Sequence, residues 1–249
     1  MKFIFDVDGT LSFDGVTIAA NVNAAITDLI LAGNEVIFAS ARPIRDLLPM
    51  IPRFKDNKLI GANGAMISAN NGVKVVSKIE MKHFELLQQL IKRYELDYII
   101  DSSWNYSSKL TKPSLIDDMI DPAQLAHNIQ IGQITDPIKT ILVNLDKHVQ
   151  KKLQKIIQAE TDLEVIGLAG EGTLDITAKG INKFSTLNLL GVDKYIAFGN
   201  DSNDLEMLSH AEQSVWIESK PSLKQFGEQA DVVCQPNSEA VATLIRRYI

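Results

Sequence analysis

Two aspartates lie one residue apart at the end of a short apolar run near the start of the chain. Residues 2–10 read KFIFDVDGT, so Asp6 and Asp8 are separated by Val7 and followed by Gly9-Thr10. The apolar run predicts a buried strand that ends in a turn. In an open α/β sheet, ligands bind at the carboxyl ends of the strands, where two neighbouring carboxylates repel each other unless a positive charge lies between them. We therefore expect a Mg²⁺ ion, which takes one or two carboxylates together with phosphate oxygens and water.

The first seventy and the last seventy residues alternate between strand and helix patterns. Asn21 can cap a helix that ends at Gly33, and residues 35–39 are typical of a second buried strand. Near the other end of the chain, residues 182–190 predict a helix and residues 195–198 a strand. A βαβ unit of this length implies parallel strands joined by a right-handed crossover. The pattern therefore predicts an α/β fold with a Rossmann-like parallel-sheet core.

The middle of the chain has a different pattern. Asn70-Asn71-Gly72 is typical of a hairpin turn, and Asp121-Pro122 predicts the start of a helix. Antiparallel hairpins with segregated helices indicate an inserted α+β domain. We therefore predict one discontinuous α/β core, residues 1–76 and 178–249, interrupted by an α+β domain at residues 77–177.

Composition and charge restrict the class of protein. Of the 249 residues, 45% are hydrophobic and 22% are charged, which is near the average for globular proteins. The formal net charge of −6 argues against a nucleic-acid-binding surface, and no apolar stretch reaches the length of a membrane span. The single cysteine, Cys234, cannot form an internal disulfide, and the N-terminus does not resemble a signal peptide. These features predict a cytoplasmic enzyme that does not bind nucleic acid or membranes.

The segment DVDGT resembles the first motif of the haloacid dehalogenase-like hydrolase superfamily, Asp-x-Asp-Gly-Thr. Three further segments resemble its other motifs: Ser40-Ala41-Arg42, the lysine that ends ITAKGINK, which is Lys183, and GNDSND at residues 199–204. The order of the predicted elements is similar to that of the Cof-like branch, in which a Rossmann-like core carries a large cap domain inserted between the second and third motifs. Asn63-Gly64 resembles a further segment of that branch.

The resemblance implies a phosphatase that forms an aspartyl-phosphate. Asp6 would be the nucleophile that attacks phosphorus, and Asp8 would be the general acid and base. Ser40 would donate a hydrogen bond to a phosphoryl oxygen, and Lys183 would neutralise Asp6 and the transferring group. Arg42 would anchor the phosphate or the rest of the substrate.

The fourth motif departs from the family pattern at its metal ligand. Family members usually carry an aspartate where this chain has Asn200, and Asp201 follows it. Either side chain would bind Mg²⁺ together with Asp6 and the main-chain oxygen of Asp8, but the amide of Asn200 brings no charge and would bind the ion more weakly. Asp204 would lie outside the ligand set and orient the lysine of the third motif or a metal-bound water. The remaining candidates for substrate binding are Asn63, Gly64 and Asn203.

These motifs predict a Mg²⁺-dependent phosphatase for small phosphorylated metabolites, such as sugar phosphates or phosphorylated cofactors. A phosphomutase of the same superfamily would share all four motifs. A non-catalytic binding protein would have a metal site weakened at Asn200. A receiver domain is also phosphorylated on an aspartate, but the long insertion and the Asp-x-Asp spacing count against it.

Overall fold

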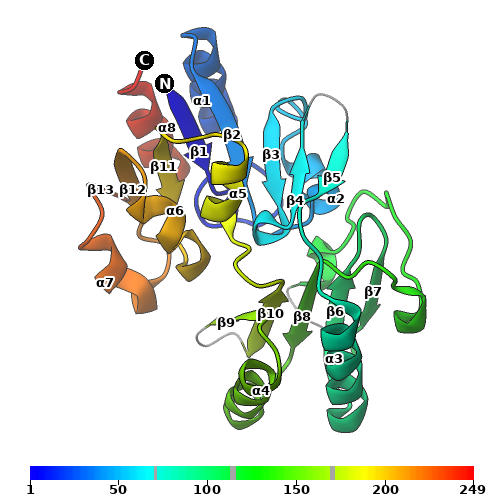
Figure 1. Cartoon of the computed structure of the whole chain (residues 1–249). Helices are drawn as coiled ribbons and strands as arrows, with labels where there is room; N and C mark the ends of the chain where they lie inside the picture. The colour runs from blue at the N-terminus through cyan, green and yellow to red at the C-terminus, as the bar shows by residue number, and fades with distance from the viewer. Residues whose placement is uncertain (70–71, 113–115, 169–171) are drawn as a thin grey trace. The chain divides into compact units, whose positions relative to one another are not determined.

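The computed structural model describes residues 1–69, 72–112, 116–168 and 172–249 of the chain, which forms two compact units (Figure 1). The first unit comprises Met1–Val73 and Asn182–Ile249, and the second comprises Lys74–Ile181. The chain therefore passes between the units a few residues from the boundaries that the sequence predicts at 76/77 and 177/178. Asn70 and Asn71 of the predicted hairpin turn lie outside the described residues.

A mostly parallel sheet forms the centre of the first unit. Its eight strands lie in the order β13-β12-β11-β1-β2-β3-β4-β5, and the chain leaves the unit in β5. The six strands from β13 to β3 run parallel, and β4 pairs antiparallel with β3. The predicted α/β fold class is confirmed. The strands are β1 (Lys2–Phe5), β2 (Glu35–Ala39), β3 (Lys58–Gly61), β4 (Met66–Ser68), β5 (Val73–Val75), β11 (Ile196–Gly199), β12 (Gln213–Ile217) and β13 (Val232–Cys234).

Helices cover both faces of this sheet, because alternate residues of a strand point to opposite faces. On one face, α1 (Ala20–Leu31) packs against α8 (Ser238–Arg246), and the ring of Phe3 meets Tyr248 just after α8. Ile4, the next residue of β1, packs in one cluster with Leu187 of α5 (Lys183–Leu189) and Met207 of α6 (Leu205–Ser209), which lie in front of the sheet in Figure 1. The unit also contains α2 (Ile44–Leu47), α7 (Lys224–Gly227) and short 3-10 helices at Leu48–Met50, Ala62–Gly64, Ser202–Asp204 and Pro221–Leu223.

An antiparallel sheet and two helices form the second unit. The sheet order is β7-β6-β8-β10-β9, and α3 (Met81–Tyr94) and α4 (Lys147–Glu160) bury Phe84 and Leu153 in one cluster with Tyr98, Leu142 and Leu174 of the sheet. This arrangement confirms that the inserted segment has an α+β fold. The strands are β6 (Asp97–Asp101), β7 (Tyr106–Lys109), β8 (Lys139–Val143), β9 (Glu164–Leu168) and β10 (Thr173–Thr177).

The predicted helix at Asp121-Pro122 is wrong. The carboxylate of Asp121 instead accepts hydrogen bonds from the main-chain N–H groups of Leu125 and Ala126, at 2.7 and 3.0 Å. These bonds close a turn rather than cap a helix. The described helical segments nearby are two short 3-10 helices, at Asp117–Met119 and Ile131–Gln133.

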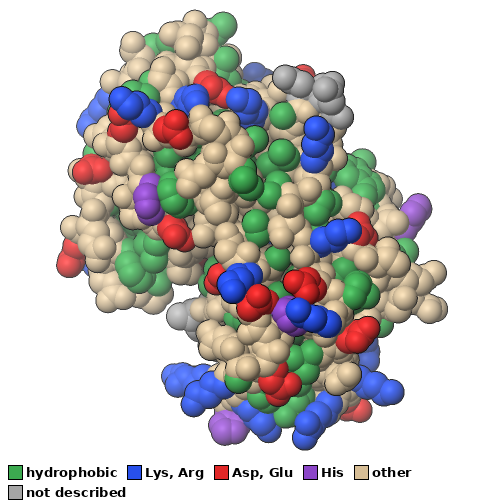
Figure 2. All heavy atoms as spheres, in the orientation of Figure 1, with side chains coloured by type: hydrophobic (Ala, Val, Ile, Leu, Met, Phe, Trp, Pro, Cys, Tyr) green, Lys and Arg blue, Asp and Glu red, His purple; other side chains and the backbone are tan. Residues whose placement is uncertain are grey.

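The helices of the second unit carry a basic outer face. Figure 2 shows lysine and arginine side chains gathered at the end of this unit that α3 and α4 form. In α4, Leu153 and Ile157 are buried, whereas the lysines are exposed. The described residues contain no helix that is both long and apolar enough to cross a membrane.

Three strands of the first unit bring polar residues to one edge of the sheet. Asp6 follows β1, Ser40 follows β2 and Asn200 follows β11. The strand register keeps these three strands level at their carboxyl ends. Because parallel strands end at the same edge, the residues that follow them meet where an open α/β sheet binds its ligands.

Gly64 lies too close to α5 for a side chain. It has a φ of +107°, and a Cβ atom there would overlap the carbonyl of Asn182 and lie 2.8 Å from Thr186 Oγ1. Gly33 also has a positive φ, +86°, but has open space around it. Gly64→Ala is therefore expected to lower the free energy of unfolding by about 1–3 kcal/mol more than Gly33→Ala does, as measured by urea denaturation. Equal losses in the two variants would contradict the close packing.

Candidate active site

A buried lysine joins two carboxylates at the carboxyl edge of the sheet. Lys183 Nζ donates hydrogen bonds to Asp6 Oδ1 at 2.6 Å and to Asp204 Oδ1 at 2.7 Å. The side chains of Lys183 and Asp204 are fully buried, and that of Asp6 is 6% exposed. Asp204 Oδ2 accepts hydrogen bonds from the main-chain N–H groups of Asn200 and Asp201, at 2.9 and 3.1 Å. The cluster thus ties the end of β1, the start of α5 and the loop after β11 together.

The start of α5 is set by Asn182, as the sequence predicts. Its side-chain oxygen accepts a hydrogen bond from the Ser185 N–H at 2.8 Å, and Ser185 Oγ accepts one from the Asn182 N–H at 3.0 Å. This reciprocal cap satisfies two main-chain donors at the helix terminus. It places Lys183 in the first turn, from which its side chain reaches the carboxylates.

The charges of this cluster shift the pKa values of its members. Burial, and next the charge of Asp204, raise the pKa of Asp6 to about 7, although the ammonium of Lys183 acts in the opposite direction. Burial would lower the pKa of Lys183, but the charges of Asp204 and Asp6 outweigh it and hold that pKa well above its ordinary value. Lys183 therefore stays protonated at neutral pH. A further cation beside Asp6 would favour the ionised form of that carboxyl.

Arg42 holds the carboxylate of Asp8. Its Nε donates to Asp8 Oδ2 at 2.8 Å and its Nη2 donates to Asp8 Oδ1 at 2.6 Å, a bidentate pair. Nη2 also donates to the main-chain oxygen of Gly15 at 2.7 Å. The Asp8 side chain remains 31% exposed. Asp8 is therefore fixed in orientation and open to solvent, while the role of Arg42 as a substrate anchor stays a prediction.

Ser40, Asn63 and Asn203 connect the loops around this edge. The buried Ser40 Oγ accepts a hydrogen bond from the Arg42 N–H at 3.0 Å, and the Ser40 main-chain oxygen accepts one from the Asn63 N–H at 3.1 Å. Asn63 Oδ1 accepts a hydrogen bond from Asn203 Nδ2 at 2.8 Å. The loops after β2, β3 and β11 are thus linked to one another. Contacts of these residues with a substrate stay predictions.

The buried carboxamide of Asn200 reaches both aspartates of the first motif. One of its terminal atoms lies 3.0 Å from Thr10 Oγ1, Asp6 Oδ2 and the Asp8 main-chain oxygen, and the other lies 2.7 Å from Ser219 Oγ. When Oδ1 takes the first position, it accepts a hydrogen bond from Thr10, and Nδ2 donates to Ser219. When Nδ2 takes the first position, it donates to Thr10, Asp6 and Asp8, and Oδ1 accepts from Ser219. Thr10 and Ser219 are therefore partners in both orientations, whereas Asp6 and Asp8 accept hydrogen bonds only when Nδ2 takes the first position.

The carboxylate of Asp201 is bound by Ser202 and Lys220. Its Oδ1 accepts a hydrogen bond from the Ser202 N–H at 2.6 Å and caps the short helix that begins there, while Oδ2 accepts one from Lys220 Nζ at 2.5 Å. Within the part of the chain that the structure describes, no three His, Cys, Asp or Glu side chains converge to hold a metal ion. Of the two candidate ligands in the fourth motif, the structure brings Asn200 to Asp6.

The oxygen atoms around Asn200 fit a Mg²⁺ ion. Asp6 Oδ2 and the Asp8 main-chain oxygen each lie 3.0 Å from the same terminal atom of Asn200. Octahedral Mg²⁺ binds oxygen at about 2.1 Å, which separates neighbouring ligands by about 3 Å. With Oδ1 in that position, one carboxylate, one carbonyl and one amide oxygen are available to the ion. Water and phosphate oxygens can complete such a set.

Thr10, Ser219 and Lys220 belong to this site, although their types and spacing did not single them out. Thr10 lies within the DVDGT segment, so the motif itself carried a signal for it. Ser219 and Lys220 follow β12, which pairs in parallel with β11. The available signal was the polar run of residues 218–220 after the apolar residues 215–217, which follow the fourth motif in the sequence.

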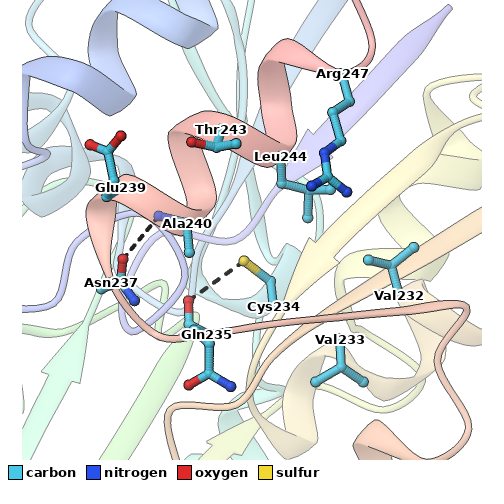
Figure 3. A pocket seen from close by; sticks show the side chains of 10 residues that line it. All are labelled: Val232, Val233, Cys234, Gln235, Asn237, Glu239, Ala240, Thr243, Leu244 and Arg247. Atoms are coloured by element: carbon cyan, nitrogen blue, oxygen red, sulfur yellow. Dashed lines mark hydrogen bonds between the residues drawn. The ribbon is translucent and has the colours of Figure 1, made fainter.

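A hollow of about 400 Å³ lies between β13 and α8 (Figure 3). Cys234, Leu244 and Arg247 line it, and Asn237 caps α8 beside it through a hydrogen bond from the Ala240 N–H, at 2.9 Å. None of its lining residues belongs to the cluster around Lys183. The candidate site is therefore at the sheet edge and not in this hollow.

The chain is similar to known proteins over nearly its whole length. The sequence profile of the haloacid dehalogenase-like hydrolases matches residues 3–245, whereas no curated protein sequence matches the chain significantly. Among solved structures, a haloacid dehalogenase-like hydrolase from B. subtilis is similar with a TM-score of 0.83 and 17% identity, over 100% of both chains. A sugar phosphatase of haloacid dehalogenase subclass IIB gives 0.80 and 20%, over 99% of this chain and 98% of that one. A phosphatase of the superfamily from Bacteroides thetaiotaomicron gives 0.79 and 18%, over 99% of this chain and 94% of that one.

The structural likenesses confirm the predicted fold. The profile match, which spans nearly the whole chain, confirms the resemblance drawn from the four motifs and the prediction of an enzyme. The chain therefore belongs to the haloacid dehalogenase-like hydrolase family.

Proposed function

We propose that the protein is a Mg²⁺-dependent phosphatase that hydrolyses small phosphorylated metabolites through an aspartyl-phosphate on Asp6. The observation that carries this proposal is the orientation of the buried Asp6 carboxylate. Lys183 holds Oδ1 at 2.6 Å, and Oδ2 lies 3.0 Å from a terminal atom of Asn200. A carboxylate fixed at both oxygens at the end of a strand is a suitable covalent nucleophile.

The charges around Asp6 match those of a phosphoryl-transfer site. Asp6 Oδ2, the Asp8 main-chain oxygen and Asn200 Oδ1 would hold Mg²⁺, which supplies positive charge to neutralise the transferring group. Lys183 adds a permanent positive charge on the other oxygen of Asp6. Since the ammonium is fully buried and held by two carboxylates, its position needs no adjustment during the reaction.

Two aspartates divide the chemistry of the proposed reaction. Asp6 Oδ1 attacks phosphorus, the bond from phosphorus to the leaving oxygen breaks, and Asp8 gives a proton to that oxygen. Asp8 then takes a proton from water, the water oxygen attacks phosphorus, and the bond to Asp6 breaks to release inorganic phosphate. Arg42 binds both oxygens of Asp8, at 2.6 and 2.8 Å, so one of these two contacts must open for Asp8 to carry the proton.

Small sugar phosphates and phosphorylated cofactors are the proposed substrates. The subclass IIB neighbour at 20% identity is a sugar phosphatase, which supports the first of these classes. The formal net charge of −6 disfavours a nucleic-acid partner. Cys234 is a buried free thiol, as expected in a reducing compartment, and we place the activity in the cytoplasm.

Phosphate release from a panel of small phosphomonoesters tests the proposal. With millimolar Mg²⁺ the native protein is expected to release inorganic phosphate from at least one sugar phosphate or phosphorylated cofactor, and excess chelator is expected to stop it. Asp6→Asn should remove the activity, because an amide cannot replace the nucleophilic carboxylate. Asp28→Asn, which removes the same charge from an exposed position of α1, is the matched control and should retain the activity.

Three outcomes of this assay contradict the proposal. Turnover that persists in Asp6→Asn would exclude the aspartyl-phosphate. Phosphate that moves to a second position of the sugar without release into solution would identify a phosphomutase. No turnover on any member of the panel would favour a binding protein.

The identity of the fourth-motif ligand gives a second test. Asn200→Ala is expected to raise the Mg²⁺ concentration for half-maximal activity by roughly tenfold or more, because it removes the amide oxygen that is proposed to bind the ion. Asp201→Ala should have a smaller effect, because Lys220 and the Ser202 N–H already occupy that carboxylate. The reverse ranking in a Mg²⁺ titration would show that Asp201 moves to the metal.

A further inference from the structure

We propose that the carboxamide of Asn200 replaces the cation when the metal is absent and reverses to bind the cation when it is present. In the metal-free protein, Nδ2 faces Asp6 and Asp8. In the metal-bound protein, the amide is flipped, so that Oδ1 faces the ion. This inference rests on the proposed Mg²⁺ site and adds to it a metal-free state that the chain itself stabilises.

The atoms that face Asn200 determine which orientation is stable without metal. Asp6 Oδ2 and the Asp8 main-chain oxygen lie 3.0 Å from its terminal atom. The Asp8 oxygen can only accept hydrogen bonds, and so can the Asp6 carboxylate in its ionised form. An amide oxygen at that point would lie against the oxygens of Asp6 and Asp8, and its hydrogen bond would come from the Thr10 hydroxyl. An amide nitrogen there offers two N–H donors to these acceptors. Because Asn200 is only 2% exposed, water cannot readily supply the missing donors.

Two hydroxyl groups allow the amide to reverse without losing its other contacts. A hydroxyl can either donate or accept a hydrogen bond. Thr10 Oγ1 donates to Oδ1 in one orientation and accepts from Nδ2 in the other, at the same 3.0 Å. Ser219 Oγ exchanges the two roles at the other end of the amide, at 2.7 Å. Reversal therefore changes only the contacts with Asp6 and Asp8. These contacts are hydrogen bonds when Nδ2 faces the two oxygens and are repulsive when Oδ1 faces them.

An aspartate could not act in this way. Both of its terminal atoms would be oxygens, so in the absence of metal it would place a second carboxylate against Asp6 Oδ2. Lys183 binds the other oxygen of Asp6, and Lys220 pairs with Asp201. Asn200 therefore gives weaker metal binding and a metal-free site without charge repulsion.

Thermal unfolding of native protein, Asn200→Asp and Asn188→Asp, in chelator and across a Mg²⁺ titration, tests the inference. Asn188 is exposed on α5, so Asn188→Asp adds the same charge without entering the site. In chelator, Asn200→Asp is expected to melt several degrees below the other two proteins. Added Mg²⁺ should restore its melting temperature, at a concentration roughly tenfold lower than the native protein needs for its own shift.

The side-chain amide of the native chain provides a measurement that needs no variant to fold. In a ¹H–¹⁵N spectrum, the NH₂ signals of Asn200 are expected to move when Mg²⁺ binds, because their partners change from Asp6 and Asp8 to Ser219. Their hydrogen exchange should be slow in the metal-free protein, where the oxygens of Thr10, Asp6 and Asp8 accept hydrogen bonds from them. Asn188 provides the reference amide, whose signals should not move.

The outcomes separate this inference from the proposed reaction, since neither measurement uses a substrate. Equal melting of Asn200→Asp and Asn188→Asp in chelator would overturn the inference, as would a Mg²⁺ shift of the melting temperature that leaves the Asn200 NH₂ signals unchanged. Absence of any response to Mg²⁺ would overturn it too. Failure of the phosphomonoester panel with the amide response intact would overturn the proposed phosphatase reaction alone.

Discussion

The ammonium of Lys183 is the interaction on which the rest of the site depends. It is fully buried, and a buried charge without partners would cost several kcal/mol. Asp6 and Asp204 satisfy it at 2.6 and 2.7 Å, and without it these two carboxylates would face each other in the same buried place. The end of β1, the start of α5 and the loop after β11 must therefore meet for any of the three charges to be tolerated.

The positions of the other groups follow from this pairing. Lys183 takes one oxygen of Asp6 and so leaves Oδ2 for Asn200 and, as we propose, for the metal. Asp204 uses its second oxygen to hold the Asn200 N–H at 2.9 Å, which sets where the amide lies. Two carboxylates and one ammonium leave a net negative charge in the cluster. The raised pKa of Asp6 reflects its burial and that imbalance, and a cation would remove the imbalance.

The fold and the centre of the site could be predicted from the sequence because their causes are local. Apolar runs that stop at Asp6, Ser40 and Asn200 mark strand ends, and parallel strands bring such ends together. Lys183 could be assigned through the motif that it ends. The partners of Arg42, Asn200 and Asp201 could not, because each has several chemically equivalent choices.

Side-chain and loop geometry decided those choices. A guanidinium can bind substrate phosphate or a carboxylate, and only the loop after β2 brings Arg42 to Asp8. Asn200 and Asp201 both carry oxygens, but Asn200 lies next to Asp6 whereas Asp201 pairs with Lys220. The predicted helix at Asp121 failed for a related reason, since the same Asp that caps helices also closes turns.

Covalent trapping during turnover tests directly whether Asp6 carries the phosphoryl group. Borohydride reduces an acyl phosphate to an alcohol, so protein treated during turnover should contain a peptide in which Asp6 has become homoserine. Mass spectrometry of the N-terminal peptide detects this change. The modified peptide is expected in native protein supplied with substrate and Mg²⁺, and it should be absent without substrate. Sustained phosphate release with Asp6 unmodified, or modification at another carboxylate, would contradict it.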